Sequence, residues 1–92
     1  MVRFRLLLSP TAEKDFVNLE AALKQRIVEK LKWFLENDVL PESLESNFEG
    51  FYKLRVGDYR IVYDLETDAV MRVRLIAHRS RVYKDLARLL RS

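Results

Sequence analysis

The spacing of apolar residues changes near residue 50, and this change constrains the fold more than any other feature of the chain. Before it, apolar residues recur at the period of an amphipathic helix. After it, apolar and polar residues alternate, which is typical of a strand with one buried face. The length of 92 residues suffices for one modest core, so residues 1–92 are predicted to form a single domain.

Two helices are predicted in the N-terminal half. Ser9 can cap the first helix, and Pro10 suits its first position because the missing N–H of proline would be unpaired there. A second helix is predicted at residues 22–37, and Pro41 prevents its continuation. Each helix has an apolar stripe, so the two are expected to form a hairpin that covers another apolar surface.

Four strands are predicted, at residues 2–8, 51–56, 59–65 and 69–77, with a turn at 66–68. Residues 42–50 are acidic and polar, and we expect them to form a loop. A short helix is predicted at residues 82–90, with an apolar stripe that packs on the rest of the domain. This order, βααβββα, predicts an α+β domain in which the helical hairpin packs on one face of a small β-sheet.

Gly57 and Asp58 are predicted to be a two-residue hairpin loop, since such turns require a positive φ. The resulting register places one set of side chains against the helices: Tyr52, Leu54, Val56, Tyr59, Ile61 and Tyr63. The opposite face has Phe51, Lys53, Arg55, Arg60 and Val62, with Arg55 directly across from Arg60. Like charges in this arrangement destabilise a sheet, which favours a bound anion on this face. The alternative is that the long side chains spread into solvent.

The two halves of the chain differ in charge. Residues 1–50 have seven Lys and Arg against nine Asp and Glu, a sum of −2, whereas residues 51–92 have ten against five, a sum of +5. A polyanion such as RNA is a natural partner of a basic half. A basic surface that only keeps the protein soluble is the alternative.

Several classes of site are excluded by composition. The chain has no cysteine and a single histidine, His78, which excludes a disulfide framework, a thiolate or polyhistidine metal site and a two-histidine ribonuclease mechanism. No apolar run approaches the roughly 20 residues of a membrane span. No cofactor or metal is expected.

RNA cleavage remains chemically accessible, because RNA contains its own nucleophile, the 2′-hydroxyl. Guanidinium groups match phosphate oxygens and can stabilise the charge that develops on them. Neighbouring cations disfavour the charged form of Lys53, so this side chain is a candidate proton acceptor.

Two stretches of the chain resemble the RelE/ParE superfamily of bacterial and archaeal toxins. The first is FYKLRVGDYRIVY at residues 51–63, which is similar to the family's Tyr-x-(Lys/Arg) strand, glycine turn and Tyr-Arg-apolar-apolar-Tyr strand. The second is HRSRVY at residues 78–83, which is similar to its His-Arg-x-x-Val-Tyr segment. The predicted order of elements agrees with a RelE-like fold.

The resemblance implies a cytoplasmic toxin of a type II toxin–antitoxin system, a metal-independent endoribonuclease that cuts mRNA on the ribosome. By match to the family's pattern, Lys53 and Arg55 would grip the RNA and assist the 2′-hydroxyl, and Arg60 would stabilise the phosphorus centre. Arg79 would help the leaving 5′-oxygen, and Tyr83 would orient or stack on the substrate. Arg55 stands where some members have a second lysine, and arginine is a poor base.

Further residues are weaker candidates for RNA binding. Arg81 is a rival of Arg79 for the catalytic role, because the match at this segment needs a short gap. Arg72 and Arg74 extend the basic face or simply contact solvent. His78 contacts RNA or only ends a strand.

The resemblance also leaves other functions open. A cognate antitoxin is implied, expected to be acidic and partly disordered until bound. The ParE branch shares this scaffold, so a DNA gyrase inhibitor that does not cut RNA is one alternative. A catalytically silent RNA- or protein-binding module is another.

Overall fold

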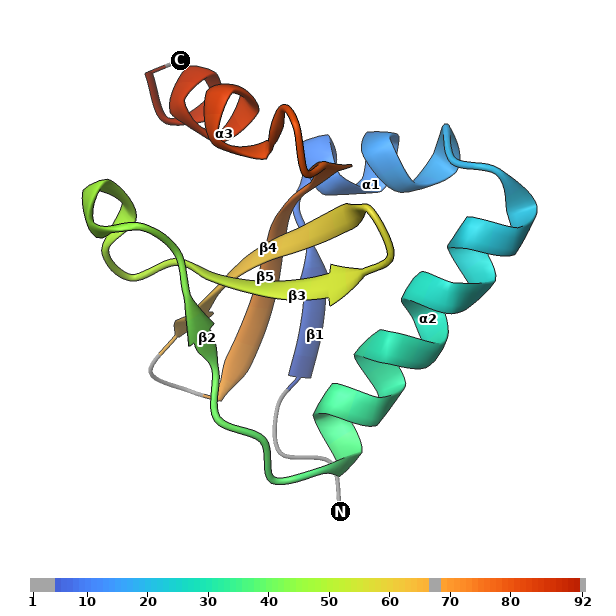
Figure 1. The fold of residues 1–92 in the computed structure, drawn as a ribbon. Helices are drawn as coiled ribbons and strands as arrows, with labels where there is room; N and C mark the ends of the chain where they lie inside the picture. Colours follow the sequence, from blue (N-terminus) through green and yellow to red (C-terminus); the bar gives the residue numbers. More distant parts are fainter. Residues whose placement is uncertain (1–4, 67–68, 92) are drawn as a thin grey trace.

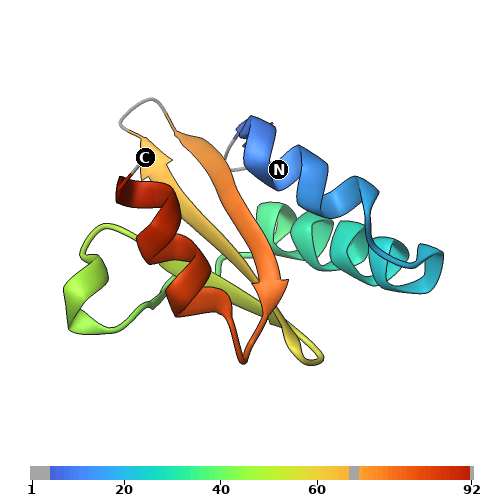
Figure 2. The same ribbon diagram turned by 90° about the horizontal axis from the view of Figure 1, so that it is seen from above.

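The computed structural model describes residues 5–66 and 69–91. These residues form an α+β fold with helices on both faces of a five-stranded mixed sheet of order β1-β5-β4-β3-β2 (Figures 1 and 2). The elements are β1 (Arg5–Leu8), α1 (Pro10–Val17), α2 (Ala21–Glu36), β2 (Glu42–Ser43), the 3₁₀ turn η1 (Ser46–Phe48), β3 (Tyr52–Val56), β4 (Tyr59–Glu66), β5 (Val70–His78) and α3 (Val82–Arg91). The predicted α+β class is confirmed, and the predicted elements occur in the predicted order with one additional strand, β2. Residues 2–4 of the first predicted strand and 67–68 of the predicted turn lie outside the described residues.

The main core lies between the sheet and the helices α1 and α2. The N-terminus of α1 follows the predicted capping, with the N–H of Ala12 donating to Ser9 Oγ at 3.2 Å and Pro10 in the first turn. The ring of Phe34 on α2 meets Tyr63 edge-on, with centroids 5.3 Å apart. The sheet side of this core includes Leu54, Val56, Ile61, Tyr63, Met71, Val73 and Ile76. The apolar face predicted for the hairpin therefore packs against the helices as expected.

The opposite face of the sheet is covered by α3 (Figure 2). A second core forms here from Leu44, Val62, Leu75, Ala77, Val82 and Leu86. The packing role predicted for the C-terminal apolar stripe is confirmed. Over the described residues, no helix combines the length and the apolar character that crossing a bilayer requires.

The prediction that residues 42–50 form only a loop is wrong. Glu42 and Ser43 form β2, which pairs antiparallel with Lys53 and Tyr52 of β3. A two-residue strand is too short to show an alternating pattern, so the sequence has no periodic signal for it. The sheet therefore has an additional edge strand beside β3, in which Glu42 pairs with Lys53.

A bulge interrupts the pairing of β4 with β5. Val62 pairs with Leu75 and Tyr63 with Val73, so Arg74 has no opposite residue. β1 pairs in parallel with β5 only as far as Leu8 and Val73. Beyond that point, two side chains at α1 form hydrogen bonds with backbone groups of β5. Ser9 Oγ, just before α1, donates to the carbonyl of Arg74 at 3.1 Å, and the N–H of Ile76 donates to Asp15 of α1 at 3.1 Å.

Candidate functional site

The β3–β4 hairpin gathers three cations on one face, which we call the basic face: Lys53, Arg55 and Arg60. The predicted register is confirmed, with Arg55 opposite Arg60 and Lys53 opposite Val62. Gly57 has φ +56° at the first position of the turn, as a type II′ hairpin turn requires. Arg60 Nη1 donates to the carbonyls of Gly57 and Tyr59, both at 3.0 Å, which holds its guanidinium near the turn.

A carboxylate from β2, Glu42, lies among these cations. Arg55 binds it with two hydrogen bonds, Nη2 to Oε2 at 2.6 Å and Nε to Oε1 at 3.3 Å, and Lys53 Nζ lies 3.7 Å from Oε2. The hydrogen bond from Arg55 lowers the pKa of Glu42, and the charges of Arg55, Lys53 and Arg60 lower it further. Sequence reasoning missed Glu42, because only the pairing of β2 with β3 shows that it faces the basic residues.

Tyr83 joins the basic face from α3. Lys53 Nζ donates to the Tyr83 hydroxyl at 3.5 Å, although the two residues are 30 positions apart. The ring of Tyr83 packs against Phe48 of η1, with centroids 5.7 Å apart. β2 therefore supplies the carboxylate, and η1, which follows it, supports the tyrosine.

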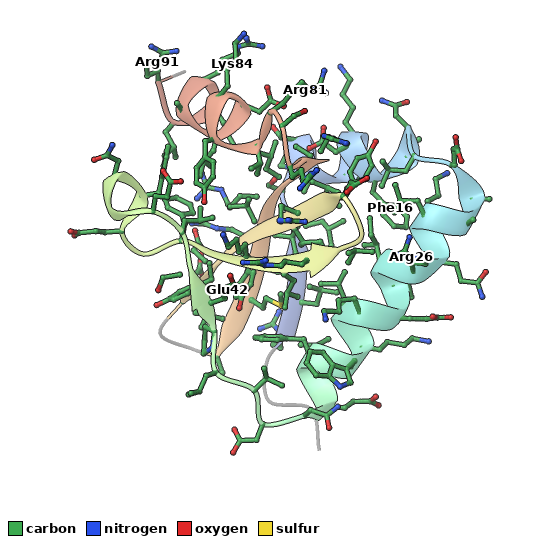
Figure 3. The ribbon with its side chains drawn as sticks, in the orientation of Figure 1. Phe16, Arg26, Glu42, Arg81, Lys84 and Arg91 are labelled. Carbon is green, nitrogen blue, oxygen red and sulfur yellow. The ribbon has the colours of Figure 1, made fainter. Side chains whose placement is uncertain are left out.

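The two rival arginines after β5 have different surroundings. The backbone N–H of Arg79 donates to the carbonyl of Asp58 at 2.7 Å, and its Nε lies 3.6 Å from the Asp58 carboxylate, which places Arg79 beside the hairpin turn. Arg81 Nε instead lies 3.9 Å from Asp85 on α3. In Figure 3, Arg81 stands beside the start of α3, well apart from Glu42. The geometry brings Arg79 closer to the basic face than Arg81.

The remaining RNA-binding candidates are engaged elsewhere. Arg72 and Arg74 both bind Asp64, each at 2.9 Å, and Arg72 also contacts Glu66 at 3.1 Å. His78 packs edge-on against Tyr59, and its Nδ1 is 2.8 Å from Ser80 Oγ. Among the described residues, no hydrogen bond or ring contact joins these three side chains to Lys53, Arg55 or Arg60. The guanidinium of Arg74 nevertheless lies 5.5 Å from the ring centroid of Phe51, a residue predicted on the same sheet face. Within residues 5–66 and 69–91, no group of three or more acidic or histidine side chains is arranged to hold a metal ion.

The part of the chain that contains the basic face also matches a known protein family. A family model described as the ParE toxin of the type II toxin–antitoxin system parDE matches residues 6–83. The chain belongs to this ParE toxin family. A comparison with curated protein sequences finds no match.

Solved structures of related toxins share the fold of this ParE-family toxin. The isolated E. coli RelE toxin is 22% identical, with a TM-score of 0.70 over 95% of this chain and 98% of that one. The YoeB dimer from Staphylococcus aureus is 27% identical, with a TM-score of 0.63 over 83% of this chain and 97% of that one. A toxin–antitoxin complex, RelBE2 from Mycobacterium tuberculosis, is 21% identical, with a TM-score of 0.72 over 85% and 93%. The predicted RelE-like fold is confirmed.

The chemistry available to this toxin follows from its charges. Arginine and lysine side chains can bind phosphate oxygens and stabilise added negative charge. An anionic carboxylate among them can accept a proton, which arginine cannot. Tyr83 adds a partly exposed ring and a hydroxyl beside Lys53.

Proposed function

We propose that this toxin is a metal-independent endoribonuclease that cleaves mRNA on the ribosome. The observation that carries the proposal is the cluster in which Lys53 and Arg55 contact the carboxylate of Glu42, Tyr83 hydrogen-bonds to Lys53, and Arg60 lies opposite Arg55. Cations that share a face without equal numbers of carboxylates suit a phosphodiester, and the nucleophile comes from the RNA itself. The basic face then needs only to orient the RNA, stabilise charge and move protons.

The reaction balances with groups on this face. Glu42 accepts the proton of the 2′-hydroxyl, the 2′-oxygen forms a bond to phosphorus, and the bond from phosphorus to the 5′-oxygen breaks. Arg60 stabilises the negative charge on the phosphoryl oxygens, and Arg79 assists the departing 5′-oxygen once it leaves Asp58. A proton from solvent completes the 5′-hydroxyl product, and the other product is a 2′,3′-cyclic phosphate.

Glu42 suits the role of base better than Lys53, the residue favoured from sequence. The lowered pKa of Glu42 keeps it ionised at neutral pH but also makes it a weaker base, so its role as base requires that RNA binding opens the pair with Arg55 and raises its pKa. Lys53 hydrogen-bonds to Tyr83 and reaches toward Glu42, a position from which its ammonium can bind a phosphate oxygen. The Arg55–Glu42 pair must open or shift when RNA binds, which frees Arg55 for the same phosphate.

A cognate antitoxin and a cytoplasmic location belong to the same proposal. Several of the solved relatives are complexes of a RelE toxin with a RelB antitoxin. An acidic antitoxin segment would complement the basic face of this chain and exclude RNA from it.

Variants of the basic face test the proposal. Cleavage of a defined mRNA on programmed ribosomes is expected to fall by about 10²–10³-fold in Arg60→Ala, which removes charge stabilisation. Glu42→Gln keeps the shape but cannot accept the proton, and we expect a loss of about 10²–10⁴-fold. Arg88→Ala on α3 is the matched control and should cleave like the parent. If folded Arg60→Ala and Glu42→Gln variants cut as well as Arg88→Ala, the site is wrong.

Inhibition of DNA gyrase is the second candidate, because the matching family model is named for ParE. A supercoiling assay with purified gyrase separates the two: an endoribonuclease leaves supercoiling unchanged, whereas a gyrase inhibitor blocks it and leaves the mRNA intact. RNA that binds without being cut would instead indicate a silent binding module.

A further inference from the structure

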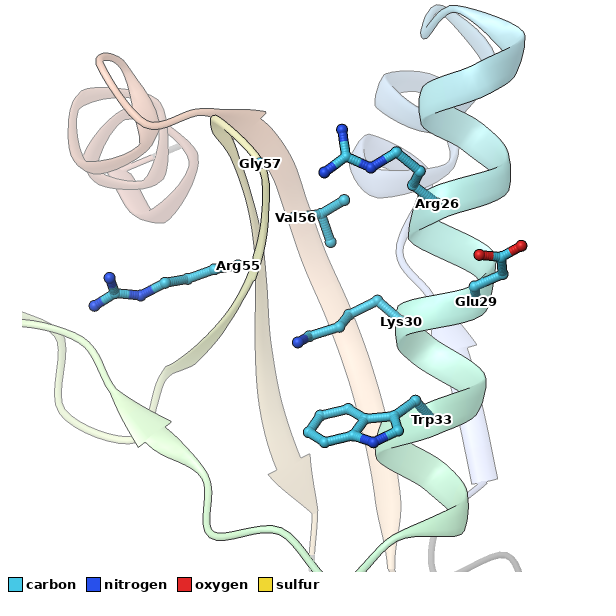
Figure 4. A pocket seen from close by; sticks show the side chains of 7 residues that line it. All are labelled: Arg26, Glu29, Lys30, Trp33, Arg55, Val56 and Gly57. Atoms are coloured by element: carbon cyan, nitrogen blue, oxygen red, sulfur yellow. The ribbon is translucent and has the colours of Figure 1, made fainter.

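A cleft between α2 and the edge of β3 lies next to the basic face, and we call it the α2 cleft. Its volume is about 440 Å³, within the usual range of ligand sites. One wall is α2 and the other is β3 with its turn (Figure 4). The lining residues are Arg26, Glu29, Lys30, Trp33, Arg55, Val56 and Gly57.

Two cations in this cleft, Arg26 and Lys30, lack the carboxylate partner that five arginines of this protein have. Five arginines each lie within 4.0 Å of an Asp or Glu oxygen, namely Arg55, Arg72, Arg74, Arg79 and Arg81. Over the described part of the chain, Arg26 and Lys30 have no such contact. Glu29, the single carboxylate of the lining, points away from β3, whereas Arg26 and Lys30 point toward it (Figure 4).

An aromatic side chain completes the cleft. Trp33 is 42% exposed, and the ammonium of Lys30 lies 4.4 Å from the centroid of its ring. An exposed indole beside unneutralised cations is the combination that binds single-stranded nucleic acid, because bases stack on the ring while cations bind the backbone. A stacked base would displace the ammonium of Lys30 from the ring toward the neighbouring phosphate.

The α2 cleft is continuous with the proposed cleavage site. A smaller hollow of about 180 Å³ shares Lys30, Trp33 and Arg55 with the cleft and also contains Glu42 and Lys53. At the other end, an added Cβ on Gly57 would lie only 3.0 Å from Arg26 Nη2, and Arg60 binds the carbonyl of this same glycine. Cations therefore surround the tip of the hairpin from Arg60 to Arg26.

We propose that the α2 cleft is a second RNA subsite, which binds a nucleotide flanking the scissile phosphate by stacking on Trp33 and by phosphate contacts to Arg26 and Lys30. The inference rests on RNA being the substrate. A peptide added as a strand fits less well, because β3 beyond its pairing with β2 leaves only Leu54–Val56 as an open edge. Strands in proteins most often have about five or six residues, so this three-residue edge offers a peptide little backbone pairing.

Trp33 is the sole tryptophan of the chain, so its fluorescence reports on this cleft directly. The titrant is a single-stranded RNA with 2′-O-methyl groups throughout, which has no nucleophile and stays intact. RNA is expected to quench the emission of the parent protein.

The double variant Arg26→Gln/Lys30→Gln should raise the dissociation constant about tenfold or more, whereas the control Lys24→Gln/Lys32→Gln, with the same charge change elsewhere on α2, should not. Trp33→Ala, followed by anisotropy of labelled RNA, should weaken binding about tenfold.

Cleavage kinetics with unmodified RNA separate this inference from the proposed function. The Arg26→Gln/Lys30→Gln variant is expected to raise KM for long RNA and leave kcat nearly unchanged, because the cleft does not touch the scissile phosphate. A parent that binds RNA through the cleft but cuts nothing would overturn the proposed function and leave the subsite. The subsite is overturned if RNA does not quench Trp33, if both double variants weaken binding equally, or if only a polyglutamate peptide quenches it.

Discussion

One partly buried carboxylate, Asp15, takes over a backbone contact that the sheet itself cannot supply. β1 ends at Leu8, and the N–H of Ile76 on β5 donates to the Asp15 side chain instead. Burial raises the pKa of Asp15, the hydrogen bond from Ile76 lowers it, and the charge of Asp85 raises it further. The net rise of the Asp15 pKa means that burial outweighs the hydrogen bond. The ionised form of Asp15 therefore lowers the stability of the folded protein.

Replacement of Asp15 by asparagine should relieve this cost. The folded protein binds a proton at Asp15 more tightly than the unfolded chain does, so this contribution to stability is full below the unfolded pKa and is lost as pH rises through the folded pKa. An asparagine Oδ1 still accepts from Ile76 and never ionises. We expect Asp15→Asn to melt above the parent at pH 7, with the difference disappearing toward pH 3, as measured by circular dichroism. A lower melting temperature at pH 7 would show that attraction to Arg81 and Lys14 outweighs burial.

At the scale of elements, the β3–β4 hairpin depends on one backbone conformation. Gly57 holds φ +56°, a region that costs other residues about 1–2 kcal/mol. Gly57→Ala should therefore lower the free energy of unfolding by about 1–2 kcal/mol in urea titrations, with Arg26 moving slightly to admit the new methyl group. Gly50→Ala is the comparison, since Gly50 has φ +86° and open space around it. A Gly57→Ala protein as stable as the parent would contradict the assignment of the turn.

Local patterns were sufficient to predict the hairpin but not its surroundings. Alternation and one glycine specify the whole β3–β4 register, and apolar spacing specifies α1, α2 and α3. The strand β2 has no periodicity of its own, so the sequence predicts a loop at Glu42. The bulge at Arg74 and the acidic partner of Arg72, Asp64, depend on how β4 meets β5, which is a tertiary property.

The whole molecule places its reactive groups where several layers meet. α1 and α2 cover one face of the sheet and α3 the other, and the basic face lies where β2, β3 and α3 converge (Figures 1 and 2). The α2 cleft lies on the side of β3 that faces α2 and adjoins the basic face at Arg55. An RNA strand that passes around the hairpin tip would contact both surfaces without crossing the cores.

Internal ion pairs should limit how strongly salt weakens RNA binding. Four arginines face carboxylates: Arg72, Arg74, Arg79 and Arg81. Lys53 and Arg55 share Glu42. The basic face and the α2 cleft then have about four effective charges, one from that shared pair and one each from Arg26, Lys30 and Arg60. Single-stranded nucleic acid releases counterions such that the logarithm of affinity falls with the logarithm of salt by about 0.7 per charge, so four charges predict a slope of about −3. All ten basic residues of the C-terminal half would give about −7. Anisotropy titrations between low and physiological salt measure this slope. Opening of the ion pairs of Asp64, Asp58 and Asp85 would add four arginines, so a slope of about −6 would mean that these pairs open when RNA binds.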